Sequence, residues 1–243
     1  MELWLVRHGE STANVLATQA QQAGEEVIAV THRDADVPLS EVGVRQAEAL
    51  GVWLAANGNE TSPASIWSSP YLRAQQTIAV ALESAGSDRR FFVDERLRDR
   101  ELGILDTLTS HGVDRRFPDE AARRRWLGKF YYRPPGGEAW TDVALRVRSF
   151  LRDVDSSGSP GPVLVAGHDA VVLVFLYICL GWSEQELLDF ASTHTVLNAS
   201  VTRLTREEGD QSWTLELFSH DGHLAALGAP VTEHAGDTNV QPR

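Results

Sequence analysis

Short apolar runs alternate along the chain with longer segments in which apolar residues recur every three or four positions. The short runs are typical of buried strands, and the longer segments are typical of helices with one buried face. This alternation predicts an α/β fold, a three-layer sandwich with a mostly parallel central sheet and helices on both faces. The predicted strands cover residues 3–6, 65–68, 91–93 and 163–166, and the predicted helices cover 41–56, 70–85, 138–154 and 170–180.

Later segments depart from this rhythm. Residues 196–204 and 213–218 alternate apolar and polar positions, which favours antiparallel strands at one edge of the sheet. Residues 18–38 are rich in Gln, Ala, Glu and Asp and predict a long surface loop with one helical turn. We expect a single domain over 1–228, followed by a loose polar tail over 229–243.

The segment 104–137 interrupts the domain. Gly112, Pro118 and the run 134–137 flank one short basic helix, predicted at 119–127. This pattern predicts a small cap inserted into the domain.

Net charge narrows the range of ligands that the protein is expected to bind. The chain has 243 residues and a net charge of −12, so binding to nucleic acid or to an anionic membrane surface is not expected. The segment from Arg89 to Arg133, however, contains 12 basic and 8 acidic residues, so it carries a net positive charge. A positive segment on a negative body can steer an anionic substrate toward a site.

A single cysteine, Cys179, excludes an internal disulfide and a zinc site with several thiolates from this chain. The histidines show no metal-ligand spacing. Residues 163–180 are mostly apolar, but His168 and Asp169 interrupt them, so we expect a strand, a turn and a core helix. The N-terminus lacks the pattern of a signal peptide, which predicts a cytoplasmic protein. A homo-oligomer is compatible with the sequence, which identifies no interface.

Candidate chemistry lies where predicted strands end. His8, Ser69 and His168 all follow apolar strands, and the carboxyl ends of parallel strands meet at one edge of a sheet. The Arg7-His8 pair suits a phosphate, because a guanidinium offers a planar fork of donors to phosphate oxygens. A neighbouring Arg also lowers the pKa of an imidazole and keeps it neutral and nucleophilic.

These residues belong to blocks that occur in order along the chain, and together they resemble the histidine phosphatase superfamily, which includes phosphoglycerate mutases and many small-molecule phosphatases. The matching residues are Leu5-Val6-Arg7-His8-Gly9-Glu10-Ser11 with Asn14, Leu39-Ser40 with Gly43 and Gln46-Ala47, Ser68-Ser69-Pro70 with Arg73-Ala74 and Gln76-Thr77, Pro134-Pro135-Gly136-Gly137-Glu138, Val163-Leu164-Val165-Ala166-Gly167-His168, and Asn198-Ala199-Ser200.

The resemblance implies that His8 is the nucleophile and becomes phosphohistidine. It implies that Arg7, Arg73 and His168 surround the phosphoryl group, with Asn14 as a further donor. Such a site needs no metal and no cofactor, because fixed cations stabilise the charge on the phosphoryl oxygens.

The proton donor has three candidates. In the mutase and small-phosphatase branch a Glu stands four residues before a Gly, and Asp99 holds that position here before Gly103. In the acid-phosphatase branch an Asp directly follows the second His, as Asp169 does. Glu101 is the third candidate. Asp99 is the favoured acid, because the rest of the chain resembles the first branch.

The resemblance predicts a phosphomonoester hydrolase for a small phosphorylated metabolite. The first alternative is a phosphoglycerate mutase. Against it, mutases carry a Trp before the Asn of the first block, where this chain has Ala13. The second alternative is a non-catalytic protein that binds a phosphorylated ligand.

Overall fold

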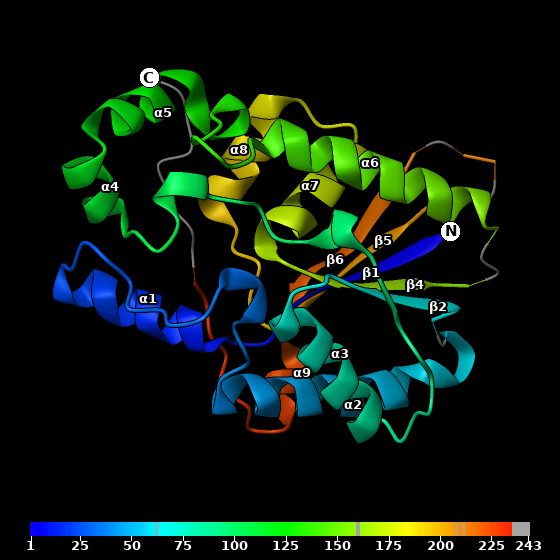
Figure 1. Ribbon diagram of the computed structural model, residues 1–243. Helices are drawn as coiled ribbons and strands as arrows, with labels where there is room; N and C mark the ends of the chain where they lie inside the picture. The colour runs from blue at the N-terminus through cyan, green and yellow to red at the C-terminus, as the bar shows by residue number, and fades with distance from the viewer. Residues whose placement is uncertain (62, 159–160, 208, 211, 235–243) are drawn as a thin grey trace.

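One six-stranded sheet forms the centre of the molecule (Figure 1). The computed structural model describes residues 1–61, 63–158, 161–207, 209–210 and 212–234. The strands are arranged in the order β3-β2-β4-β1-β5-β6. Their bounds are β1 Glu2–Arg7, β2 Ser65–Ser68, β3 Phe92–Val93, β4 Val163–Gly167, β5 Val201–Thr205 and β6 Thr214–His220.

The pairing confirms a mostly parallel sheet with an antiparallel edge. Strand β1 is parallel to β4, and β4 is parallel to β2. Strands β5 and β6 run antiparallel and close one edge. Strand β5 begins at Val201 and not at 196 as predicted. Residues 197–200 instead form a turn, because Ala199 adopts a positive φ of 54° and its N–H donates to the carbonyl oxygen of Arg7.

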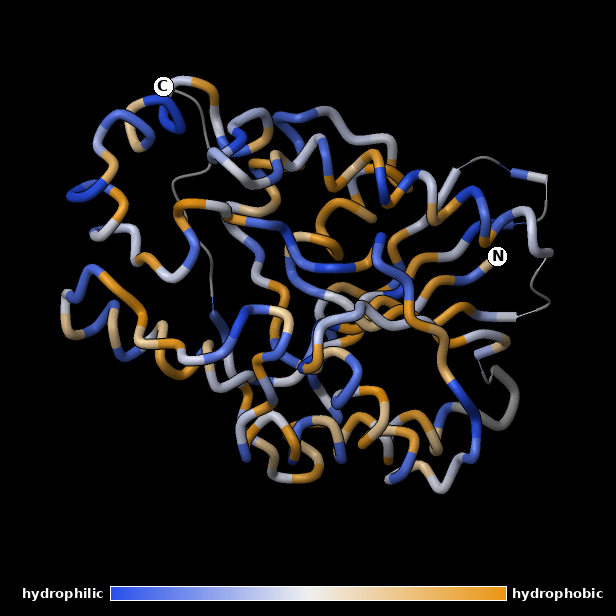
Figure 2. The backbone as a smooth tube through the Cα atoms, in the orientation of Figure 1, coloured by the Kyte–Doolittle hydropathy of each residue, from blue (hydrophilic) through white to orange (hydrophobic). Residues whose placement is uncertain are grey.

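Helices cover both faces of the sheet, as expected. Their bounds are α1 Thr12–Ala23, α2 Glu41–Thr61, α3 Leu72–Ser84, α4 Ser110–Arg116, α5 Pro118–Tyr131, α6 Trp140–Ser156, α7 Asp169–Cys179, α8 Glu184–Thr193 and α9 Gly222–Ala226, with 3-10 turns η1 Asp34–Asp36, η2 Glu95–Leu97 and η3 Gly103–Leu105. Along α2 and α3, hydrophobic stretches recur between hydrophilic ones, as expected for helices that bury one face (Figure 2).

Strand β1 shows how the two layers form. Successive side chains of a strand point to opposite faces of the sheet. Leu3 and Leu5 therefore pack in one core with α6 and α7, whereas Trp4 and Val6 pack in another with α2 and α3. The apolar segment 163–180 forms β4, a turn and the core helix α7, as predicted. No helix among the described residues is long and apolar enough to span a bilayer.

The cap segment contains two helices, α4 and α5, where the sequence predicted only one. A small apolar cluster of Leu105, Val113, Ala121 and Tyr132 holds it together. In Figure 1, α1, α4 and α5 lie on the side toward which the carboxyl ends of the parallel strands point. The cap therefore stands over the strand ends that carry the candidate residues.

Other segments differ from the prediction. Helix α1 continues to Ala23, so the loop is shorter than expected, although η1 supplies the single helical turn. Helix α8 went unpredicted, and the capping box of Ser183 and Glu186 is the signal that could have revealed it. Residues 229–234 are not the expected loose tail, because Gln46 donates to Pro230 and the Thr232 hydroxyl donates to Asn198. Residues 235–243 of that tail lie outside the described part.

Candidate active site

The candidate residues meet at the carboxyl ends of three adjacent parallel strands. Arg7 ends β1 opposite Gly167, which ends β4, and the N–H of His8 donates to the carbonyl oxygen of Gly167 over 3.0 Å. His168 follows Gly167 and stands before the first turn of α7. Ser69 follows β2 in the same way. The strand register thus brings together side chains that are about 160 positions apart in the sequence.

Close backbone packing fixes the turn after β1. A Cβ atom on Gly43 would lie 2.0 Å from the carbonyl oxygen of Glu10, and one on Gly9 would lie 2.6 Å from that of Gly43. Only glycine permits this approach. The side-chain oxygen of Gln46 accepts from the N–H of Glu10 over 2.8 Å. The second sequence block therefore holds the first in place.

The turn before β5 supports the same segment from behind. The buried Asn198 donates through Nδ2 to the carbonyl oxygen of His8 over 3.0 Å. The N–H of Ala199 donates to the carbonyl oxygen of Arg7 over 3.0 Å. The backbone of His8 is therefore held on both sides by buried hydrogen bonds, which limits its movement.

The His8 imidazole has a defined tautomer. Its Nδ1 lies 2.6 Å from the carbonyl oxygen of Gly9, which can only accept, so Nδ1 carries the proton and Nε2 has the lone pair. The side chain is buried. Burial, and then the charges of Arg73, His168 and Arg7, lower the pKa of His8 well below its usual range. The ring is therefore neutral at pH 7 and competent as a nucleophile.

Arg73 lies in the first turn of α3 with a side chain that is 5% exposed. Its Nη1 donates to the backbone oxygen of Asp34 over 2.7 Å and to the Asp34 carboxylate over 2.9 Å. Its Nη2 donates to the Oδ2 atom of Asp99 over 3.0 Å. Two carboxylates therefore hold one guanidinium.

His168 and Asp99 extend this cluster. Nε2 of His168 lies 2.8 Å from the Ser69 hydroxyl, and Nδ1 lies 3.2 Å from Oδ2 of Asp99. The ring centroids of His8 and His168 are 5.2 Å apart, and the two rings meet edge to face with an angle of 62° between their planes. Burial acts to raise the pKa of Asp99, but His168 and Arg73 overcome it and hold that pKa well below the usual range. Burial lowers the pKa of His168, against the opposing effect of Asp99.

Arg7 differs from Arg73 in its partners. It donates to the backbone oxygens of Val196 and His234. Its buried Nε atom has no hydrogen-bond partner within the described ranges. None of the described carboxylates lies within ion-pairing distance of it. Arg7 is therefore a buried cation whose charge is not matched by a direct acidic partner.

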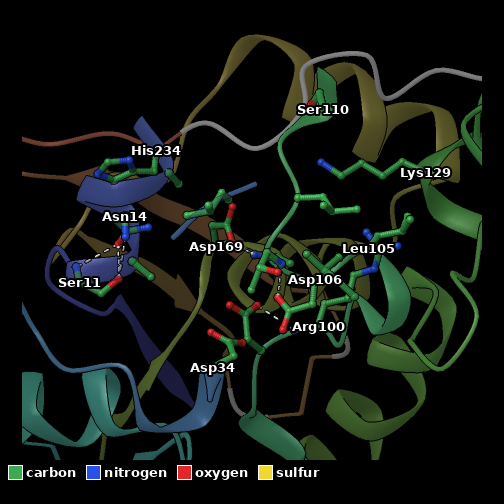
Figure 3. A pocket seen from close by; sticks show the side chains of 18 of the residues that line it. Ser11, Asn14, Asp34, Arg100, Leu105, Asp106, Ser110, Lys129, Asp169 and His234 are labelled. Carbon is green, nitrogen blue, oxygen red and sulfur yellow. Dashed lines mark hydrogen bonds between the residues drawn. The ribbon is translucent and has the colours of Figure 1, made fainter. Parts of the chain in front are cut away.

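Arg7, His8, Arg73 and Asp99 line a cavity of about 420 Å³. His168 is fully buried and is not among the residues that line the cavity, although it contacts Asp99, which does line it. Figure 3 shows Asn14 and His234 on one side of the cavity, and Asp34, Asp106 and Arg100 on another, with Asp169 between them. The side-chain oxygen of Asn14 accepts from the N–H and the hydroxyl of Ser11, each over 3.0 Å, which leaves its amide nitrogen as a donor. The predicted phosphate residues Arg7, His8, Asn14 and Arg73 thus share one cavity.

The structure separates the three candidate acids. Asp99 and Asp169 line the cavity, whereas Glu101 does not and accepts a hydrogen bond from the Tyr71 hydroxyl over 2.8 Å. Asp169 stands at the start of α7, where one carboxylate oxygen accepts from the N–H of Ala170 over 2.7 Å. Among the described residues, Asp169 makes no ion pair.

Sequence reasoning missed Asp34, Asp106 and His234, which also line the cavity. Each comes from a loop or a terminal segment with no periodicity and no matching block, so the sequence carried no signal for them. No group of three or more His, Cys, Asp or Glu side chains in the described ranges is arranged to hold a metal ion.

The strand ends bring two histidines and two arginines together, and Arg7, His8 and Arg73 line one cavity there. Such groups suit the binding of a phosphoryl group. Comparison with known proteins identifies the family. The histidine phosphatase superfamily (branch 1) matches residues 3–220, and the chain belongs to this family.

Relatives within the family include both phosphatases and mutases. The 2,3-bisphosphoglycerate-dependent phosphoglycerate mutase of Methylobacterium radiotolerans is 31% identical over 217 residues, which is 86% of this chain and 95% of that protein. The bifunctional protein Rv2228c of Mycobacterium tuberculosis is 31% identical over 215 residues, which is 85% of this chain. The chain spans only 54% of the length of that protein.

Solved structures show the same fold. A mycobacterial glucosyl-3-phosphoglycerate phosphatase superposes with a TM-score of 0.70 at 26% identity, and the match covers 90% of this chain and 98% of the other. Sequence and fold therefore place this chain in the histidine phosphatase superfamily, and the proteins similar to it include a phosphatase and a mutase.

Proposed function

We propose that the protein hydrolyses the phosphomonoester of a small phosphorylated metabolite through a phosphohistidine on His8. The observation that carries the proposal is the His8 imidazole, whose Nε2 lone pair stands among buried guanidinium groups beside a cavity of about 420 Å³. That volume lies in the range of small-molecule sites. It leaves room for an organic group beyond the phosphate.

In the first step Nε2 of His8 forms a bond to phosphorus while the ester P–O bond breaks, and the leaving oxygen takes a proton. Arg7, Arg73 and the amide nitrogen of Asn14 stabilise the charge on the equatorial oxygens. In the second step water attacks phosphorus and gives a proton to the carboxylate that protonated the leaving oxygen, the P–N bond breaks, and inorganic phosphate leaves. His8 regains its neutral form with the lone pair on Nε2.

Asp99 marks a place for an anionic oxygen. Its Oδ2 atom lies 3.0 Å from Nη2 of Arg73 and 3.2 Å from Nδ1 of His168. We assign this place to a phosphoryl oxygen when substrate is bound. The incoming dianion then takes over the Arg73 and His168 nitrogens that Asp99 contacts in the structure.

This exchange allows Asp99 to act as the proton donor. A carboxylate that loses its cationic partner and gains an anionic neighbour becomes more basic, so it can hold a proton for the leaving oxygen. Asp169 is the alternative donor, because it lines the same cavity without an ion-pair partner in the described part of the chain. Glu101 is not proposed, since its carboxylate contacts Tyr71 outside the cavity.

Arg100 favours a substrate with a second negative group. It lines the cavity, and it donates to the backbone oxygens of Glu138 at 2.7 Å and Tyr132 at 3.4 Å. Burial and then the charge of Arg124 lower the pKa of Arg100 to about 10. A carboxylate or a second phosphate on the substrate would stabilise this half-buried cation.

A phosphoglycerate mutase is the second candidate, and the identity to a curated mutase over 95% of that protein supports it. A mutase must exclude water and return the phosphoryl group to a bound intermediate. We favour the hydrolase because the first block departs from the mutase pattern at Ala13, where mutases carry a Trp.

One experiment separates these functions. The purified protein is given a chromogenic phosphomonoester with and without a chelator, and then a panel of phosphorylated metabolites. Phosphate release that is unaffected by the chelator supports the hydrolase. Interconversion of phosphoglycerates that depends on bisphosphoglycerate would establish the mutase. Phosphate binding without any turnover would support a non-catalytic binding protein and contradict our proposal.

A further inference from the structure

We propose that Asp34 determines the specificity of the site by competing with the phosphoryl group for Arg73. This inference rests on the proposed function. In it, the Asp34 carboxylate weakens the binding of inorganic phosphate and of small esters. Substrates whose organic group also fills the cap end of the cavity are then favoured.

The contacts of Arg73 carry the first step. Both terminal nitrogens of its guanidinium are engaged, Nη1 by Asp34 and Nη2 by Asp99. The Arg73 side chain is 5% exposed, so water does little to solvate it when a partner leaves. A phosphoryl group that binds to Nη1 must therefore displace the Asp34 carboxylate or share the donor with it.

Arg7 provides the contrast. It faces the same cavity, but among the described residues it donates only to backbone oxygens. A dianion can therefore bind to Arg7 without displacing a carboxylate. The free-energy cost of displacing Asp34 therefore arises when the phosphoryl group binds to Arg73.

Asp34 belongs to a segment that also contacts the cap. This 24–38 segment connects α1 to α2 and includes η1. The N–H of Ile28 donates to the carbonyl oxygen of Thr107 over 2.8 Å, and the N–H of Thr109 donates to that of Glu26 over 3.2 Å. One end of the segment is thus bound to the cap, and the other holds Arg73.

The same segment lines the cavity between these two anchors. Ile28, Val30 and His32 face the cavity together with Asp34. A ligand can shift the position of a segment only through contacts that differ between its two positions. Inorganic phosphate bound near Arg73 does not extend to Ile28 and Val30, whereas a larger substrate can also contact these two side chains. Those additional contacts can offset the displacement of Asp34, which yields discrimination between the two ligands.

The test compares Asp34→Asn with Asp36→Asn. The first substitution removes the charge while keeping size and hydrogen-bonding groups. The second is the matched control, because Asp36 lies in the same short turn but pairs with the exposed Arg33, whereas Arg73 pairs with Asp34 and Asp99. The full chain of each variant is titrated with inorganic phosphate by calorimetry. Turnover is measured with phenyl phosphate and with the best substrate from the metabolite panel.

Asp34→Asn should tighten phosphate binding about two- to fivefold, the range expected for loss of one partly exposed ion pair. The preference in kcat/KM for the metabolite over phenyl phosphate should fall by a similar factor. Asp36→Asn should change neither quantity. A purely structural role of Asp34 would lower both activities together and leave their ratio unchanged.

Unchanged or weakened phosphate binding in both Asp34→Asn and Asp34→Ala would overturn the inference, since Asp34 would then only position Arg73. The proposed hydrolase fails in a distinguishable way. If no variant turns over any ester but Asp34→Asn still binds phosphate more tightly, the competition holds and the hydrolase assignment does not.

Discussion

Nδ1 of His8 donates a hydrogen bond to the carbonyl oxygen of Gly9 over 2.6 Å. The N–H of Gly9 in turn donates to the hydroxyl of Thr77, which donates to the carbonyl oxygen of Arg73. The nucleophile and the first turn of α3 are thus joined by a continuous chain of hydrogen bonds. This arrangement fixes both the tautomer of His8 and its position relative to the Arg73 backbone.

Replacement of the nucleophile tests the central step. His8→Ala should reduce phosphatase turnover on the order of a thousandfold or more and abolish acid-quenched labelling of the protein by a radioactive phosphomonoester. His32→Ala is the matched control, because His32 also lines the cavity but is exposed and far from the strand ends in sequence. Labelling that persists in His8→Ala on another residue would show that the nucleophile lies elsewhere.

The low pKa of His8 predicts a dependence of stability on pH. Burial and nearby cations lower the pKa of His8, so the unfolded chain binds a proton below about pH 6.5 that the folded chain does not. The free energy of unfolding should therefore fall as the pH falls. The contribution of His8 is up to about 1.4 kcal/mol per pH unit below that value.

Urea unfolding at several pH values between about pH 7.5 and about pH 5.5 measures this effect. His168 has a pKa shifted in the same direction by burial, so it adds to the slope. His8→Gln should make the slope smaller by removing one contribution. A slope that is identical in the wild type and in His8→Gln would mean that His8 titrates normally in the folded protein.

The proton donor can be identified by comparing two variants, Asp99→Asn and Asp169→Asn, in which an amide replaces a carboxylic acid. Asp99→Asn should slow hydrolysis about 10²–10⁴-fold for an ester with a poor leaving group, the usual worth of general acid catalysis. The loss should be smaller for nitrophenyl phosphate, whose leaving oxygen needs little protonation. Asp169→Asn should have a weaker effect on both esters, and a reversed ranking would assign the acid to Asp169.

The leaving-group comparison is needed because Asp99 also contacts Arg73 and His168. If Asp99 served only to position those side chains, its substitution would slow both esters equally. A selective loss for the poor leaving group therefore reports proton donation and not a general disturbance of the phosphate site.

The position of a bound oxyanion provides a further test. Vanadate soaked into crystals should lie beside Nε2 of His8, within hydrogen-bond distance of Arg7 and Arg73. We also expect Oδ2 of Asp99 to move away from Nη2 of Arg73 in that complex, since an oxygen of the anion takes its place. Vanadate bound anywhere else in the cavity would refute the assigned phosphate site.

Sequence alone placed Arg7, His8 and His168 together because the geometry of parallel strands leaves little choice. Each follows an apolar strand, and the carboxyl ends of such strands meet. Arg73 was predicted as a phosphate-binding residue because it belongs to the sequence block that begins at Ser68 and lies near the start of a predicted helix. Asp34 and His234 could not be predicted, because they reach the cavity through loop and terminal segments whose paths depend on long-range contacts. Likewise, only the fold revealed that Glu101 turns toward Tyr71 while Asp99 faces His168.

Gly43 offers a test of how the second block supports the nucleophile. A Cβ at Gly43 would lie 2.0 Å from the carbonyl oxygen of Glu10, so Gly43→Ala must push the segment that follows His8 away from α2. Overpacking of this kind typically costs about 1–3 kcal/mol of stability. We also expect a loss of kcat, because the displaced segment carries the Gly9 carbonyl that orients the His8 imidazole.

Gly24→Ala is a suitable control, since it introduces strain at a positive φ of 69° but meets no atom within 4 Å. It should lower the thermal midpoint while leaving kcat/KM unchanged. Equal losses of kcat in the two variants would mean that activity follows overall stability, and that the contact between Gly43 and Glu10 has no special part in placing His8.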